Sequence, residues 1–247
     1  MKTNLPACLS AALSLTLLSA CNTVQTELVL TPVQLGTKTM VRADRTGACV
    51  DLDRSVIPPS RLALADGEIG AGYENTFIRG ADPLPCNTRR NYAHQGAVLF
   101  DLSEVTRRHA VVLEAILEGS ERVELFPEGI VIHLDVQRAA QPWVAGNFVG
   151  PVNTVDPRAQ IPLLPLAFGD ETNALSGNMR DGATTVGLNT LVTHTVQDWL
   201  SIRPRAVNHG FVITARPEHL FAEENENLVV AYGNIRLRLK LLEPRGP

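Results

Sequence analysis

The chain has 247 residues, of which 45% are hydrophobic and 19% are charged, with 22 Lys and Arg against 26 Asp and Glu. This composition excludes an intrinsically disordered chain, which needs low hydrophobicity and high net charge. The net charge of −4 argues against a nucleic-acid binder, because no basic excess is present to neutralise phosphates. The length allows one domain with a sizeable core.

The first 21 residues predict export from the cytoplasm. The positive charge of Lys2 precedes an apolar run over residues 5–18, which is shorter than the roughly 20 apolar residues that span a bilayer. A charged start and a short apolar stretch that ends in small residues are typical of a cleavable secretory signal. Residues 1–20 are therefore expected to be removed from the mature protein.

The segment Leu18-Ser19-Ala20-Cys21 resembles the lipobox of bacterial lipoproteins. The resemblance implies that cleavage precedes Cys21, that the sulfur and the new amino group of Cys21 are acylated, and that the lipid bilayer is a partner. Asn22 is not the Asp that resembles the inner-membrane retention signal. The outer membrane is therefore expected rather than the inner membrane. An ordinary secretory signal with a chance cysteine is the alternative.

The mature chain would keep 227 residues, with 21 basic and 26 acidic side chains. We expect residues 21–26 to form a tether and residues 27–243 to form a single domain. Cys8 leaves with the signal, and the remaining pair, Cys49 and Cys86, predicts a disulfide in an exported protein. Neither has a second cysteine at the spacing of a metal site, and we expect no metal or cofactor.

Alternation of apolar and polar residues with a period of two predicts strands with one face in the core. The pattern is clearest in residues 130–137 and 234–241, where every second residue is Ile, Leu or Val. Turn-forming residues bound most of the strands, and no series of helical patterns intervenes. We therefore expect an all-β fold, a jelly-roll-like antiparallel β-sandwich. Further strands are expected at residues 27–35, 96–102, 110–118, 210–215 and 228–232.

Three segments depart from this pattern. Residues 191–200 place Val192, Val196 and Trp199 on one helical face, which predicts a short helix that caps the open end of the sandwich and buries Trp199. Residues 53–91 and 142–190 are rich in turn-forming residues and are expected to be loops.

Four segments taken in order resemble the DNRLRE-type domains: GAVLFDLSEV (96–105), AVVLEAILEG (110–119), VTHTVQDWLS (192–201) and NHGFVI (208–213). The resemblance covers roughly residues 96–241. It implies a jelly-roll β-sandwich of the kind found on secreted or surface-attached proteins and linked to carbohydrate binding. The long insertion at residues 142–190 departs from compact members.

The motif residues themselves are expected to be structural. Gly210 would permit a tight entry into a strand, and Asn208 would form hydrogen bonds to the turn backbone. The other motif residues are Phe100, Asp101, Trp199 and Phe211, with both phenylalanines in the core.

No catalytic motif occurs in the chain, which has no G-x-S-x-G, H-E-x-x-H, EF-hand or P-loop pattern. No catalysis is therefore expected. His133 and Asp135 share one face of a strand, where a solvated surface is a better interpretation than a metal site. The acidic residues between 218 and 226 could act on sugars if two carboxylates faced each other across a cleft, but a solvated loop is the simpler interpretation.

Aromatic side chains outside the core are the expected sugar contacts, because sugar rings pack against aromatic faces. Trp143, Phe148, Tyr73 and Tyr92 lie in segments that read as loops, and Trp143 is the first choice, with anchoring of its own loop as the alternative. Arg236, Arg238 and Lys240 could meet an anionic glycan, although charged strand faces more often discourage edge pairing.

These observations favour a lipid-anchored binding or structural module of the cell envelope that contacts carbohydrate. One alternative is a lipoprotein that binds another envelope protein. A second is a small hydrolase that acts on glycans.

Overall fold

The computed structural model describes residues 23–46, 60, 62–78, 87–125, 131–151, 173–178, 188–204, 207–215 and 227–244. Within these ranges the fold is all-β, as expected, and two short helices accompany the strands. The elements in chain order are β1 (Thr23–Leu30), β2 (Gln34–Thr46), β3 (Ile69–Ile78), β4 (Asn87–Leu99), α2 (Ser103–Arg107), β5 (Val111–Leu125), β6 (Val131–Arg138), β7 (Phe148–Pro151), β8 (Asn173–Asn178), β9 (Leu188–Leu191), α3 (Thr193–Trp199), β10 (Phe211–Ala215) and β11 (Asn227–Pro244).

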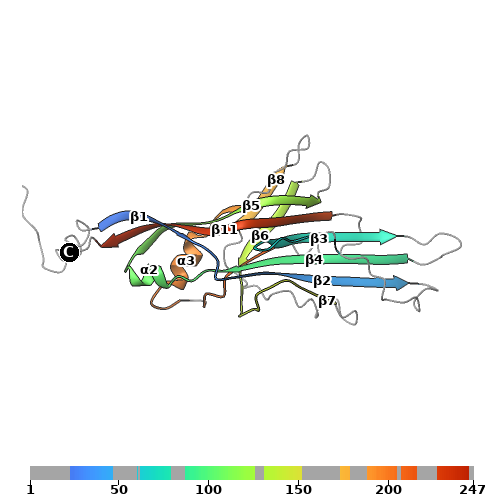
Figure 1. Ribbon diagram of the computed structural model, residues 1–247, viewed down its shortest axis with the longest axis horizontal. Coiled ribbons are helices and arrows are strands. Elements are labelled where there is room, and N and C mark those ends of the chain that lie inside the picture. The colour runs from blue at the N-terminus through green and yellow to red at the C-terminus, as the bar shows by residue number, and fades with distance from the viewer. Residues whose placement is uncertain are drawn as a thin grey trace, which may run out of the picture.

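The strands form a nearly closed, barrel-like sandwich in the order β8-β6-β10-β4-β3-β11-β5-β9 (Figure 1). Strand β1 adds to β11, and β2 adds to β4. The pairings are antiparallel except that of β2 with β7. Strand β3 bonds to β4 along one edge and to β11 along the other, so it joins the two halves of the sandwich.

The alternating pattern near the C-terminus is confirmed. Strand β11 buries Ile235, Leu237, Leu239 and Leu241, whereas Asn234 and Arg236 are exposed. The expected strands 228–232 and 234–241 are parts of one 18-residue strand. In β6, Leu134 and Val136 are buried as expected, but Asp135 is buried too, which contradicts a solvated outward face at that position.

The expected strand at residues 27–35 is in fact two strands. β1 ends at Leu30 and β2 begins at Gln34. Pro32 lies between them and lacks the backbone donor that a continuous ladder needs. Residues 23–26, expected in the tether, are part of β1 and pair with Pro244–Leu241 of β11.

The prediction of loops at 53–91 and 142–190 is wrong in part. The first segment contains β3 and the start of β4, and the second contains β7, β8 and most of β9. Residues 69–75 of β3 are all buried, on both faces of the strand. A strand covered on both faces has no solvent side to create alternation, and so the pattern was absent.

The helix prediction is confirmed for α3 but missed α2. Asp101 of the FDLS motif starts α2, because its carboxylate accepts hydrogen bonds from the Ser103 backbone N–H at 2.9 Å and from the Ser103 hydroxyl at 2.8 Å. These bonds lower the pKa of Asp101, with the backbone bond as the larger cause. The motif therefore ends one strand and begins a helix.

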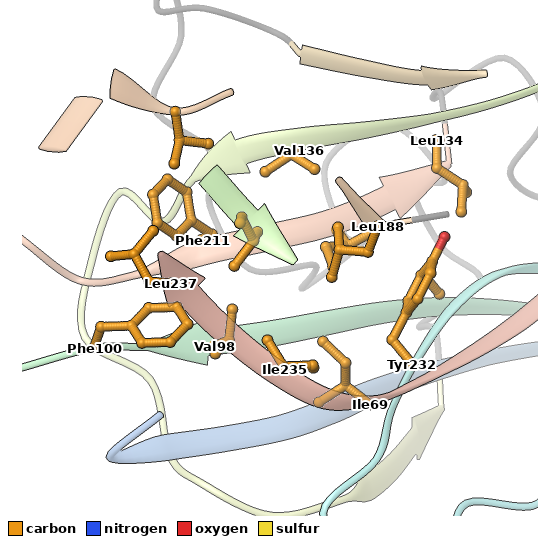
Figure 2. Close-up of a cluster of buried hydrophobic side chains, with 14 of the residues drawn as sticks. Ile69, Val98, Phe100, Leu134, Val136, Leu188, Phe211, Tyr232, Ile235 and Leu237 are labelled. Atoms are coloured by element: carbon orange, nitrogen blue, oxygen red, sulfur yellow. The ribbon is translucent and has the colours of Figure 1, made fainter. Parts of the chain in front are cut away.

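The main core lies between the two halves of the sandwich (Figure 2). Phe100 and Phe211 are buried in it, as expected. Trp199 of α3 packs partly buried against this core, and its ring centre lies 4.9 Å from that of Phe211. Arg138 of β6 and Asp198 of α3 form a buried ion pair at 2.8 Å, with side chains only 4% and 9% exposed, which fixes the helix to the sheet.

The turn before β10 is built as the motif implied. The Asn208 side-chain amide donates to the Phe100 carbonyl at 3.0 Å, and the Gly210 N–H donates to the Asn208 side-chain oxygen at 3.0 Å. Gly210 has a φ of 89°, and a Cβ atom there would overlap the carbonyl oxygen of Val98. Both the backbone angle and the close approach to β4 therefore require glycine.

We predict that Gly210→Ala lowers the free energy of unfolding by about 3 kcal/mol or more, because backbone strain and a backbone overlap add together. Gly67→Ala is the matched control. Gly67 has a similar φ of 79° but no atom near its missing Cβ, so only the strain of about 1 kcal/mol is expected. Urea denaturation of both variants measures the difference, and equal losses would show that the overlap is relieved by movement of β4.

We also predict that Arg138→Ala lowers the free energy of unfolding by about 3–5 kcal/mol, because it removes the guanidinium group that pairs with the buried Asp198 carboxylate. The double variant Arg138→Met with Asp198→Leu removes both charges and should recover stability to within about 1 kcal/mol of the parent. Thermal and urea unfolding of the three proteins provide the measurement. If the double variant were no more stable than Arg138→Ala, the cost of Arg138→Ala would not be due to the charge that Asp198 retains.

Candidate binding groove

A groove of about 810 Å³ opens where β11 departs from regular pairing. Its volume lies within the range of small-molecule sites, roughly 300–1,000 Å³. Residues from four strands, and from the turn after β1, surround it. The described lining residues are Val29, Thr31, Glu118, Gly119, Ser120, Leu188, Asn189, Asn234, Ile235 and Arg236.

A β-bulge in β11 creates the groove. The register with β5 shifts between Gly233 and Arg236, and Asn234 has a φ of 50°. On the opposite edge of β11, β1 pairs only as far as Leu237 and β3 pairs only as far as Tyr232. Residues 233–236 therefore lie between two partner strands, which leaves room for the groove. Bulges of this kind often redirect side chains at functional sites.

Asn234 and Ser120, two of the polar residues of the groove, are held by hydrogen bonds. The Asn234 amide donates to the Ser120 hydroxyl at 3.1 Å, and that hydroxyl donates to the Gly233 carbonyl at 3.0 Å. Asn189 projects from β9 and is exposed. Within the part of the chain that the structure describes, its side chain makes no hydrogen bond and lines the groove.

One carboxylate, Glu118, stands among the described lining residues. Arg236 donates to it at 2.8 Å and Arg238 at 2.7 Å. The hydrogen bond from Arg238 is the largest cause that lowers the pKa of Glu118, and Arg236 adds to it. The carboxylate is therefore ionised at neutral pH and largely neutralised by the two guanidinium groups.

This arrangement offers groups that can bind a ligand. Amide, hydroxyl and guanidinium groups offer both donors and acceptors, while Val29, Leu188 and Ile235 provide an apolar floor. Glycoside hydrolysis requires two carboxylates across the sugar, whereas the described lining holds a single, ion-paired one. The chemistry of the groove suits a neutral ligand with several hydroxyl groups.

The structure does not bring the expected aromatic residues together at this groove. Tyr73 and Tyr92 lie in strands β3 and β4, not in loops, and each is only 4% exposed, so neither offers a ring face to a ligand. Trp143 is half-buried, packs against a small cluster with Val212, and donates its indole N–H to the His209 carbonyl at 2.7 Å. Those contacts anchor its loop. The Phe148 side chain lies outside the described residues.

The basic residues of β11 also form ion pairs within the fold. Arg236 and Arg238 meet Glu118, and Lys240 meets Glu114 at 3.0 Å. These cross-strand pairs hold β11 to β5. They leave less free positive charge for an anionic glycan than the sequence suggested.

Several expected residues cannot be placed. Cys21, Cys49, Cys86 and the acidic residues 218–226 lie outside the described residues, as does the His133 side chain. Within the described ranges, no group of three or more His, Cys, Asp and Glu residues is arranged to hold a metal ion. Neither of the helices in these ranges has the length and apolar character that crossing a bilayer requires.

A second polar cluster lies beneath the segment that precedes β3. His94 is fully buried, and its Nε2 lies 3.1 Å from Glu74 Oε1 and 3.4 Å from the Ser60 hydroxyl, while its Nδ1 lies 3.0 Å from the Thr39 hydroxyl. The Ser60 hydroxyl also donates to Glu74. In a catalytic triad the serine and the carboxylate contact opposite nitrogens of the ring. Here both contact Nε2, so the cluster holds residue 60 against the sheet.

Sequence reasoning missed both the groove and this cluster. A signal for the groove was present, because Gly233-Asn234 interrupts a regular alternation and turn-forming residues inside a strand indicate a bulge. No signal marked His94 or Glu74. Each is a polar residue of a strand that contacts Ser60, and the sequence gives no local signal for that contact.

Comparison of the chain with protein-family models, with curated proteins and with solved structures gives no match. The functional argument therefore depends on the residues of this chain and on the geometry of its groove.

We predict that Glu118→Gln weakens the dependence of stability on pH in the acid range. The pKa of Glu118 is lowered in the folded protein, so its stabilising effect is complete above the ordinary carboxyl pKa of 4.5 and is lost as the pH falls through the lower folded value. Glu118→Gln has no carboxylate to protonate, so its stability does not fall for this reason. Urea unfolding between pH 7 and pH 3 should therefore show a smaller decline in stability below pH 4.5.

Arg238→Gln provides the matched test, because it removes the largest cause of the shift. The double variant Glu118→Gln with Arg238→Gln should lose no more stability than Glu118→Gln alone. If the losses of stability in the two single variants add up in the double variant, the two side chains act independently, which would contradict the pairing of Glu118 with Arg238.

Proposed function

We propose that this protein is a lipid-anchored module of the bacterial cell envelope that binds a neutral, hydroxyl-rich ligand of the carbohydrate class in the groove at the β11 bulge. The observation that carries the proposal is the groove itself, which places available and hydrogen-bonded polar groups around an apolar floor. Binding of this kind fixes a ligand by a few oriented polar groups over an apolar surface.

The proposed location follows from the lipobox-like segment that ends at Cys21. Acylation of the Cys21 sulfur and amino group would attach the domain to a bilayer, and more than one acyl chain is needed for stable attachment. Asn22 favours the outer membrane as the destination. The likeness of residues 96–241 to DNRLRE-type domains supports carbohydrate as the ligand class.

Neutral ligands fit the groove better than charged ones. A carboxylated glycan would approach Glu118, which remains ionised at neutral pH. A cationic ligand would meet the guanidinium groups of Arg236 and Arg238, which already hold that carboxylate. A hydroxyl group can donate to Glu118 or accept from Arg236 without displacing either charge.

The test is binding of the mature, lipid-free domain to an array of neutral and charged envelope oligosaccharides. We predict binding to neutral oligosaccharides, and about a fivefold to tenfold loss of affinity in Asn189→Ala, the equivalent of one hydrogen bond. Asn189 is chosen because its side chain is exposed in the groove and makes no other described hydrogen bond.

Gln25→Ala is the matched control. Gln25 is an exposed amide on β1, and its pairing with Leu242 places it roughly 20 Å along β11 from Arg236. The affinity of Gln25→Ala for oligosaccharides should equal that of the parent protein. Equal affinity in Asn189→Ala would exclude this groove, and absence of oligosaccharide binding would favour a protein partner instead.

A further inference from the structure

We propose that the end of the sandwich where β1 begins and β11 ends rests directly on the lipid bilayer, so that the groove opens at a fixed height above the membrane. This inference rests on the proposed acylation of Cys21. It adds to that proposal the surface that contacts the lipid and the orientation of the domain. The surface consists of Val24, Val111, Leu113, Arg107 and Pro244 and is called the membrane end below.

The length of the connection to Cys21 is the first argument. β1 is paired with β11 from Thr23 onward, so the ordered sheet begins two residues after the acylated cysteine. Two residues span at most about 7 Å. A domain held this closely cannot stand clear of the headgroups, because Asn22 alone would separate the acylated residue from the first residue of the sheet.

The second argument is the kind of side chain found there. Val24, Val111 and Leu113 are 38%, 59% and 44% exposed. Val24 lies on the face of the sheet that Leu28 and Leu30 share, and Val111 lies on the opposite face, so apolar side chains are exposed on both faces near this end. Val24 is opposite Glu243 in β11, and Val111 is opposite Leu242, so both lie within three residues of the end of the strand. Figure 1 shows the start of β1, the end of β11 and helix α2 at the same end of the molecule.

The polar groups beside these residues suit the interface between headgroup and acyl chain. Arg107 of α2 has a side chain that is 75% exposed and pairs with Glu104. Arg108 bridges Glu104 at 2.7 Å and Glu243 at 3.2 Å. Arginine side chains can lay their apolar stems along such a surface and direct the guanidinium group to lipid phosphates. Glu104 and Glu243 balance the two arginines, so contact with the bilayer would depend on the apolar side chains and the acyl chains rather than on net positive charge.

The orientation sets the height of the groove. Val29, at its near edge, is six residues along β1 from Thr23, which corresponds to roughly 20 Å. The headgroup region on each side of a bilayer is only about 5–8 Å thick. The groove would therefore open into the aqueous space and receive ligands from it, not lipid from the membrane.

The experiment places single tryptophans at two heights on the full-length, acylated protein reconstituted into vesicles of phosphatidylethanolamine and phosphatidylglycerol. Val24→Trp and Val111→Trp report on the membrane end. Val29→Trp lies on the same strand as Val24 and has a similar exposure of 48%, so it is the matched control. Phospholipids brominated near the top of the acyl chain quench tryptophans that reach the interface, and the parent protein gives the background from Trp143 and Trp199.

We predict that the added fluorescence of Val24→Trp and Val111→Trp is quenched at least about twofold more strongly than that of Val29→Trp. The two positions lie on different strands, so misfolding of one variant leaves the other as a test. Equal quenching at all three positions in protein that floats with the vesicles would overturn the orientation alone. Failure to float would overturn the acyl anchor and the orientation together, while leaving oligosaccharide binding by the lipid-free domain as a separate measurement.

Discussion

The backbone pairing of β11 along both edges is the constraint on which the rest of the structure depends. One edge pairs with β5 over most of its length, and the other pairs first with β3 and then with β1. Strand β11 therefore joins the N-terminal strand to the centre of the sheet. Because β3 and β1 occupy the same edge in succession, a short length of β11 is left between them. The bulge at Gly233 and Asn234 falls in that gap, and the groove follows from it.

Burial on both faces of the central strands explains the polar cluster around His94. Gly70 of β3 leaves space where the Leu62 side chain packs on the strand, and Gly72 allows the close approach of the neighbouring β11 backbone. Residues 69–75 of β3 are buried on both faces. Polar side chains under such a cover must find partners within the protein, because an unsatisfied buried group is costly. Glu74, Ser60 and Thr39 meet both nitrogens of His94, and the same bonds hold the cover in place.

The sequence predicts those parts of the fold in which each residue faces either core or water. Ile235, Leu237 and Leu239 alternate with polar residues because β11 has one solvated face there, and α3 is visible because Val196 and Trp199 lie one turn apart. The same reasoning fails in β3, where Ile69, Gly70 and Ala71 are all buried. The same reasoning also fails to locate the groove, because it expects aromatic residues at a binding site. Tyr73 and Tyr92 instead fill the interior. The polar lining of the groove includes Asn, Ser, Glu and Arg residues, and strand register brings them together, which no local pattern reveals.

The register of β1 with β11 also fixes the position of the groove relative to the strand that follows the proposed anchor. Thr23 and Val29 lie on one hydrogen-bonded strand, and the cross-strand pairs of Glu118 with Arg236 and Arg238 hold the neighbouring strands to it. A binding site on a flexible tether samples a large volume and pays ordering entropy when it engages a fixed ligand. A site carried on a paired strand that begins two residues after the proposed acylation site would already be oriented. Such an arrangement favours ligands that are themselves fixed to the envelope, because both partners then meet at a constant distance from the membrane.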